Sequence, residues 1–182
     1  PDLNGSTEAN SSVTLYAKWT ANTYTVTLDM QSGTGGTASV TATYGLVMPD
    51  ATQPTRVGYI FAGYYTEVNG GGTGYYAPDD TDADSYMQSS RTWNIACATT
   101  LYAYLTAESH TVTFDSEGGS VVDDIVANYG ASITLPTPTL TGYVFGGWWT
   151  GDNGTGTQRT WTTMPDLNGS TEANSSVTLY AK

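Results

Sequence analysis

Three aspartates in one acidic stretch carry the side chains best suited to binding a metal ion. Asp80, Asp82 and Asp84 stand at alternate positions, as in calcium-binding loops, because a hard cation takes several carboxylate oxygens as ligands. Ser85, however, stands where an EF-hand needs glycine, and Arg91 stands where it needs a bidentate glutamate. Two interpretations stay open, a calcium site on these three aspartates and a solvated acidic loop, and the two mismatches favour the loop.

Adjacent aromatic residues are the second group with a binding chemistry, since sugars stack on flat aromatic faces. Alternation along a strand buries one of any two neighbours, so we expect at most one ring of the Trp148–Trp149 pair at the surface. The aromatic residues that we regard as candidates for recognising a glycan or a protein are Trp149, Tyr65, Tyr75 and Tyr76.

Catalytic groups are few and form no constellation. His110 is the only histidine. We expect it to face solvent at a module junction, and the sequence has no nucleophile-elbow motif to complete a triad. Asp123 and Asp124 lie in or beside a predicted strand, where adjacent side chains point to opposite faces and do not converge on one substrate.

The lone cysteine, Cys97, excludes an internal disulfide and a cysteine-based zinc site. We expect it to be a small buried side chain, with an intermolecular disulfide as the alternative. Taken with the poor set of catalytic groups, this predicts no enzyme and, calcium apart, no cofactor.

The composition is that of a β-rich protein with an acidic surface. Only 12% of the residues are charged, and 17 acidic residues against 5 basic ones give a net charge of −12. So few lysines and arginines cannot neutralise phosphates, which excludes nucleic acid as a partner and disfavours anionic membrane surfaces. No apolar run approaches the ~20 residues that cross a bilayer, so we expect no membrane insertion in this segment. Thr and Tyr favour strands, and Gly and Asn favour the turns between them.

Internal repetition indicates how the chain is organised. The first 18 residues, PDLNGSTEANSSVTLYAK, recur without a change at 165–182, which gives a period of 164 residues. A diverged repeat lies inside this period, since TVTLD at 25–29 matches TVTFD at 111–115. We expect an interior piece of a longer array, divided into a closing strand of a preceding module (1–19), a first module (20–106) and a second module (107–182).

Each module is predicted to form a small sheet. The runs 25–29 and 111–115 alternate branched or apolar residues with threonine, which is typical of a strand with one buried face. A Gly-rich turn and a second strand follow in both modules, as in a hairpin. A Gly-Tyr-x-Phe-x-Gly block then leads to the paired aromatics, with Tyr143 and Phe145 on one face of a strand. The last strand closes a sheet of about four strands, and the loop before it has room for a short helical turn near 162–167.

The order of these motifs resembles the Listeria–Bacteroides repeat, also called the internalin B-repeat, over nearly the whole chain. The resemblance implies mainly β modules of small α+β, β-grasp-like form, arranged in tandem on bacterial surface proteins and adhesins, often as spacers. It implies no catalytic residue. The first module departs from the family pattern with Tyr64 in place of Trp and Leu105 at the position of Trp19. Because an aromatic recurs at the position of Trp148 in the family pattern, the resemblance also implies that Trp148 lies in the core. The residues that match the pattern are Gly118, Gly119, Tyr129, Gly130, Gly142, Tyr143, Phe145, Gly147, Trp148 and Leu15 to Trp19.

Together these features predict an extracellular protein with a structural function, a stalk or filament segment of a secreted, adhesin-like surface protein. Its expected partners are neighbouring repeats of the same polypeptide or of adjacent chains in a fibre. The linkers at 21–23 and 107–109 are short, which favours a fixed orientation between modules. We expect residues 1–19 to be ordered only where something pairs with them. The alternative function is an adhesive module that binds a glycan or a host surface protein.

Overall fold

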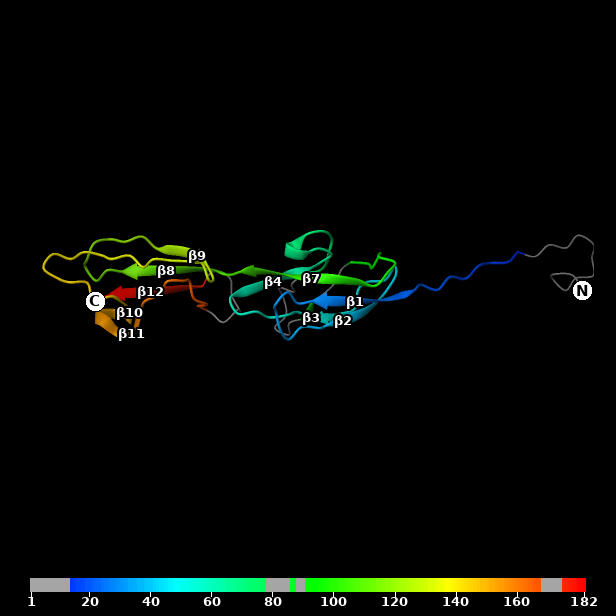
Figure 1. Ribbon diagram of the computed structural model, residues 1–182, viewed down its shortest axis with the longest axis horizontal. Coiled ribbons are helices and arrows are strands. Elements are labelled where there is room, and N and C mark those ends of the chain that lie inside the picture. The colour runs from blue at the N-terminus through cyan, green and yellow to red at the C-terminus, as the bar shows by residue number, and fades with distance from the viewer. Residues whose placement is uncertain (1–13, 78–85, 88–90, 168–174) are drawn as a thin grey trace, which may run out of the picture.

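The computed structural model describes residues 14–77, 86–87, 91–167 and 175–182, and two five-stranded sheets make up most of it (Figure 1). The first sheet has the strand order β2-β1-β7-β4-β5. Its strands are β1 (Thr23–Asp29), β2 (Ser39–Thr43), β4 (Tyr59–Tyr65), β5 (Gly74–Tyr76) and β7 (Thr99–Ala107). A 3-10 turn, η1 (Val68–Gly70), lies between β4 and β5, and two short strands, β3 (Ala51–Thr52) and β6 (Tyr86–Met87), pair with each other.

The second sheet repeats this arrangement with the order β11-β10-β12-β8-β9. Its strands are β8 (Ser109–Asp115), β9 (Ile125–Asn128), β10 (Trp148–Gly151), β11 (Thr155–Arg159) and β12 (Ser176–Ala181), and η2 (Asp152–Gly154) lies between β10 and β11. The predicted mainly β class with tandem sheets is confirmed. Each sheet has five strands where the sequence predicted about four, because the Gly-rich segment after the paired aromatics turns back as an edge strand. The described segment 162–167 contains no helical turn, and Thr163 forms an antiparallel bridge to Ser132 instead.

The last strand of each module lies at the centre of its sheet. The predicted hairpins are present, since β1 pairs antiparallel with β2 and β8 with β9. β7 then pairs parallel with β1 and antiparallel with β4. β12 does the same between β8 and β10. A strand from the end of the module therefore joins the hairpin from its beginning to the aromatic strand from its middle.

Each sheet covers a hydrophobic core of its own. Val26 and Leu28 on β1 are buried in one cluster with Leu101 on β7 and with Trp93. The threonines that alternate with them on β1 are exposed, which is the period-two pattern that the sequence predicted. The corresponding buried residues of the second cluster are Val112, Trp148, Met164 and Leu179.

A single residue separates the last strand of the first sheet from the first strand of the second. β7 ends at Ala107 and β8 begins at Ser109, so that Glu108 alone connects them. Figure 1 shows the two sheets end to end along the long axis of the molecule, with β7 and β8 following one another. At the other end of the first sheet, residues 14–22 form no strand and lead away from β1, and Trp19 is 90% exposed.

Candidate functional site

The junction between the two sheets is held by backbone and ring contacts from both modules. The N–H of Glu108 donates to Gly58 O (2.9 Å), and the N–H of Tyr129 donates to Glu108 O (2.7 Å). The rings of Tyr59 and Tyr129 meet edge to face, with their centroids 5.9 Å apart. Gly58 has a φ of +73°, and a Cβ at this position would collide with the Tyr129 ring, so the contact requires glycine.

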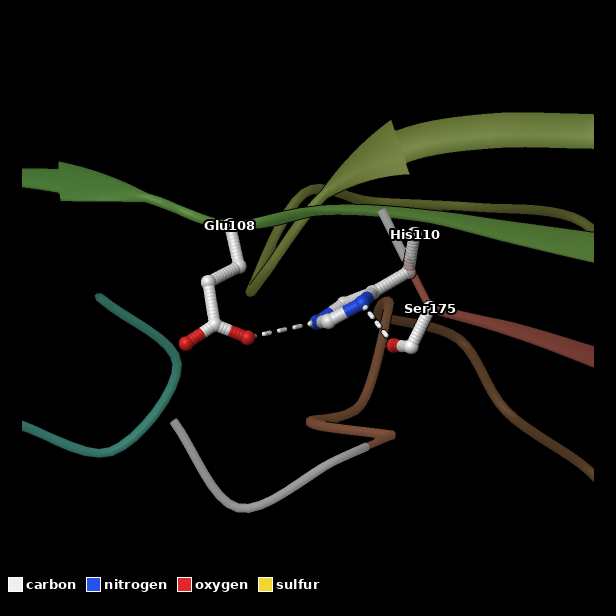
Figure 2. Close-up of polar contacts among 3 residues, drawn as sticks. All are labelled: Glu108, His110 and Ser175. Atoms are coloured by element: carbon white, nitrogen blue, oxygen red, sulfur yellow. Dashed lines mark hydrogen bonds and ion pairs between the residues drawn. The ribbon is translucent and has the colours of Figure 1, made fainter. Parts of the chain in front are cut away.

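Polar side chains of the connecting residue Glu108 and of two residues of the second module, His110 and Ser175, gather at this connection (Figure 2). Ser175 Oγ lies 2.7 Å from His110 Nδ1, and Glu108 Oε2 lies 3.6 Å from His110 Nε2. Both Glu108 and His110 have 0% of their side chains exposed. Asp166 is partly buried, and its carboxylate oxygen and the donor atoms of Glu108 and His110 all lie within 4.8 Å of one another. A histidine and two carboxylates thus face one point inside the junction.

The prediction that His110 faces solvent was wrong. Side chains two apart on a strand point to the same face, and Val112 is fully buried in the second core. Alternation therefore placed His110 on the buried side, and this signal was available in the sequence. The preceding sheet also shields His110 from solvent, because only Glu108 separates β8 from that sheet.

Among the described residues, the first module has different side chains at the positions of this polar cluster. Aligning the repeated TVTLD and TVTFD runs puts Asn22 at the position of Glu108 and Tyr24 at the position of His110. Tyr24 packs against the first hydrophobic core. The strand pairings put Cys97 at the position of Ser175, since Thr99 pairs with Val26 as Val177 pairs with Val112. The start of the first module is thus much less polar than the start of the second.

The expectation for Trp148 agrees with its position. It is buried, its Nε1–H donates to Pro136 O (2.7 Å), and its ring lies 4.6 Å from that of Phe114, centroid to centroid. Trp149, next to it, is only partly buried, and Lys182 Nζ lies 4.8 Å from the centre of its ring. Tyr65 holds the corresponding place in the first module.

Tyr65 has the same setting as Trp149, with an aromatic neighbour in place of the lysine. It is partly buried, and the Tyr104 ring from the closing strand lies 6.1 Å from it, centroid to centroid. Trp149 and Tyr65 are therefore partly buried aromatic rings at equivalent positions of the two sheets. Of the four aromatic residues predicted to bind a ligand, Trp149 and Tyr65 are the two that are partly exposed to solvent.

The prediction that Tyr75 and Tyr76 are exposed and recognise a glycan or a protein was wrong. Both are buried in the first core, because the edge strand β5 folds back over it. The Tyr75 hydroxyl donates to Asn94 Oδ1, and that of Tyr76 donates to Pro49 O (2.6 Å). Burial raises the pKa of both hydroxyls, and for Tyr76 the charge of Asp50 adds to this effect.

The remaining candidates do not form a site among the described residues. Asp80, Asp82 and Asp84 lie outside the described residues. Asp123 and Asp124 precede β9 and are both exposed, so they do not alternate across a strand. Cys97 is free and exposed, so the prediction that it is buried was wrong, and the reason is its place in the loop before β7 rather than on the strand.

The Gly-Tyr-x-Phe-x-Gly block of the second module differs from its predicted form. Tyr143 is 75% exposed, Phe145 packs against the second core, and the block forms no strand, so the two side chains do not share one face. In the first module, the same block is the start of β4, and it pairs with Leu105–Ala107 at the end of β7. In the second module, the N–H of Gly146 donates to Lys182 O and the N–H of Lys182 donates to Gly147 O, so the end of the block is bonded to the residue after β12.

Comparison with known proteins agrees with this architecture. The Listeria-Bacteroides repeat domain matches residues 24–104 and 110–182, one match for each sheet. The chain is 35% identical over 141 residues to a protein of Evansella cellulosilytica named as a Gly-rich membrane protein, covering 75% of this chain and 15% of that protein. It is 32% identical over 162 residues to Internalin H of Listeria monocytogenes, covering 87% of this chain and 25% of that protein.

The chain thus spans a quarter or less of the length of these relatives. Among the described residues, no helix has the length and apolar character needed to cross a membrane. The two family matches extend over most of the sequence and coincide with the two sheets. This chain therefore belongs to the Listeria–Bacteroides repeat family, whose repeats are modules of surface proteins.

Proposed function

We propose that this chain is a spacer segment of an extracellular, adhesin-like surface protein, in which tandem modules form a stiff stalk or filament. The single observation that carries the proposal is the connection between the sheets. The central strand of the first sheet, β7, passes through one buried residue, Glu108, into β8, which lies beside the central strand β12 of the second sheet. Two neighbouring loops are bonded to that residue, so the connection has little freedom to bend.

The exposed apolar residues at both ends support an array of such junctions. Residues 14–18 are identical to 178–182, yet Leu15 is 87% exposed where Leu179 is 0% exposed. Because 178–181 belong to β12, the central strand of its sheet, we infer that residues 14–18 take the same central place in the sheet of a preceding module. At the opposite end, Val144 is 93% exposed beside Tyr143. Tyr143 matches Tyr59, which packs on the following module. Neighbouring repeats of the same polypeptide, or of adjacent chains in a fibre, are therefore the proposed partners.

Small-angle scattering on proteins with one, two and three copies of the 164-residue unit tests this proposal. A stiff stalk gains a constant maximum dimension with each copy, roughly 55–60 Å for the length of β7, Glu108 and β8 at ~3.3 Å per residue. Modules that pack side by side, or that move freely about their connections, would give a much smaller increase. That result would contradict the spacer role.

Recognition of a glycan or a host surface protein is the second candidate function, and Trp149 and Tyr65 favour it. Each is partly exposed at an equivalent place on its sheet. A glycan array probed with the native chain and with Trp149→Ala and Tyr65→Ala tests it. Loss of a signal in these variants, with the signal kept in Tyr44→Ala, which changes an exposed tyrosine elsewhere, would support a binding module. Absence of any signal from the native chain would contradict it.

A further inference from the structure

We propose that the junction between the two sheets is a binding site for one divalent transition-metal ion of the zinc type, with Glu108, His110 and Asp166 as ligands. One imidazole and two carboxylates form a donor set that zinc accepts in proteins. Their donor atoms all lie within 4.8 Å of one another. The proposal is independent of the spacer role, since a stiff connection needs no metal and a metal site needs no array.

The separation of the donor atoms fits a shared ion better than a direct bond. His110 Nε2 and Glu108 Oε2 are 3.6 Å apart, which is too long for a hydrogen bond. Two ligands that each lie about 2.1 Å from one tetrahedral zinc ion are about 3.4 Å apart. Among the described residues, no group forms a hydrogen bond with Nε2, although the histidine is fully buried. A buried imidazole nitrogen in this state points to a ligand.

The other ring nitrogen of His110 already has the partner that a metal-binding histidine needs. Ser175 Oγ lies 2.7 Å from Nδ1. A proton on Nδ1 is donated to this hydroxyl, which fixes the plane of the ring and directs the lone pair of Nε2 toward the carboxylates. Figure 2 shows this arrangement, with the ring between Ser175 on one side and Glu108 on the other.

Charge and placement also favour a cation here. The carboxylates of Glu108 and Asp166 approach each other within the cluster, and Glu108 is fully buried. A divalent ion is attracted to two carboxylates that lie this close together. Glu108 belongs to the connection, whereas Asp166 lies in the loop before β12. The ion would therefore fasten the connecting residue to the second module.

The first module provides the matched substitutions for a test. It carries Asn22 where the second carries Glu108, and Tyr24 where the second carries His110. Glu108→Asn and His110→Tyr therefore introduce side chains that the same fold holds at the same positions. Asp124→Asn removes an equal charge from an exposed carboxylate outside the cluster and serves as the control.

Isothermal titration of the EDTA-treated full chain with ZnCl2, and the absorption spectrum of its Co²⁺ form, test the proposal. We expect one ion per chain and visible Co²⁺ bands typical of tetrahedral nitrogen and oxygen ligands. Binding should be lost in Glu108→Asn and His110→Tyr and kept in Asp124→Asn. Ser175→Ala keeps all three ligands and should weaken Zn²⁺ binding about 10- to 100-fold, so it still tests the site if the other variants fail to fold.

Two results would overturn the metal site. The first is no Zn²⁺ uptake by the native chain, which would leave the cluster as a buried histidine–carboxylate pair. The second is uptake that all four variants keep unchanged, which would assign the ion to surface carboxylates. Neither result bears on the scattering test of the stalk, so the two proposals can fail separately.

Discussion

Lengthening the connection between the sheets tests whether this connection makes the molecule stiff. The continuous run from Thr99 to Asp115 contains β7 (9 residues), Glu108 and β8 (7 residues), about 55 Å at ~3.3 Å per residue. The perturbation is the insertion of Gly-Gly-Ser-Gly-Gly-Ser between Ala107 and Glu108. A flexible linker of six residues has a root-mean-square length of about 12–15 Å, which is enough to separate the two loops that now hold the connection.

Spin labels on the native exposed Cys97 and on Val121→Cys, at a side chain that is 92% exposed, report the distance across both sheets. Pulsed electron–electron double resonance measures the distance between the two labels. For the native connection it should give a narrow distance distribution centred at about 60 Å, from the extended length of the strands. The insertion should broaden that distribution by on the order of 10 Å, as the linker length indicates.

The same hexapeptide inserted after Gly71, in the turn beyond η1, is the control. It adds equal length and flexibility to one module without entering the connection, so the distribution should stay narrow. A native distribution as broad as that of the linker insertion would refute the reasoning, because it would mean that the contacts around Glu108 do not hold the two sheets in one orientation.

Four further outcomes follow from the described contacts. Trp148→Ala should lower the free energy of unfolding of the second module by about 3–5 kcal/mol, measured by urea denaturation, with Trp148→Tyr far less costly because the first module holds Tyr64 there. Burial, with the charge of Asp29 as second cause, raises the pKa of Tyr64 from 10.0 to about 12. The unfolded chain therefore loses this proton first, so the stability of the first module should be complete below pH 10 and fall as the pH rises toward 12. Tyr64→Phe should reduce this fall in urea titrations, with the remainder coming from Tyr75 and Tyr76, whose pKa values are also raised; a fall that the substitution leaves unchanged would assign it to other groups. Gly58→Ala should destabilise the chain more than Gly118→Ala, since both glycines have positive φ but nothing lies within 4 Å of the second; equal losses in thermal melts would mean that the Tyr129 contact contributes nothing. Calcium titration should leave the melting temperature unchanged, as expected for a solvated loop, and a calcium-dependent rise that disappears on changing the loop to asparagine would instead support a site on Asp80, Asp82 and Asp84.

The sequence predicted the features of the fold that depend on local pattern. Alternation in TVTLD and TVTFD located the hairpin strands and the buried face, and the unchanged recurrence of 18 residues indicated tandem units. The fifth strand was missed because its turn, rich in glycine, has no apolar period and looks like a loop. Tyr75 and Tyr76 lie in that strand, so their burial was missed for the same reason.

The polar cluster depends on contacts that local pattern does not describe. His110 and Ser175 are 65 residues apart in the sequence, and they meet only because β12 lies beside β8 in the centre of the sheet. Alternation from Val112 predicts the face on which His110 lies, but it does not predict what covers that face. The covering atoms come from Glu108 and Asp166, whose positions follow from how one sheet is joined to the next.

The parallel pairing of the first and last strands of a module has a mechanical consequence. In an array, tension enters the first module at the start of β1 and leaves it at the end of β7. Because these two strands run side by side in the same direction, pulling slides one along the other and loads all of their hydrogen bonds in shear at once, rather than opening them one by one. The same geometry holds for β8 and β12. An array of such modules would therefore resist stretching at every repeat.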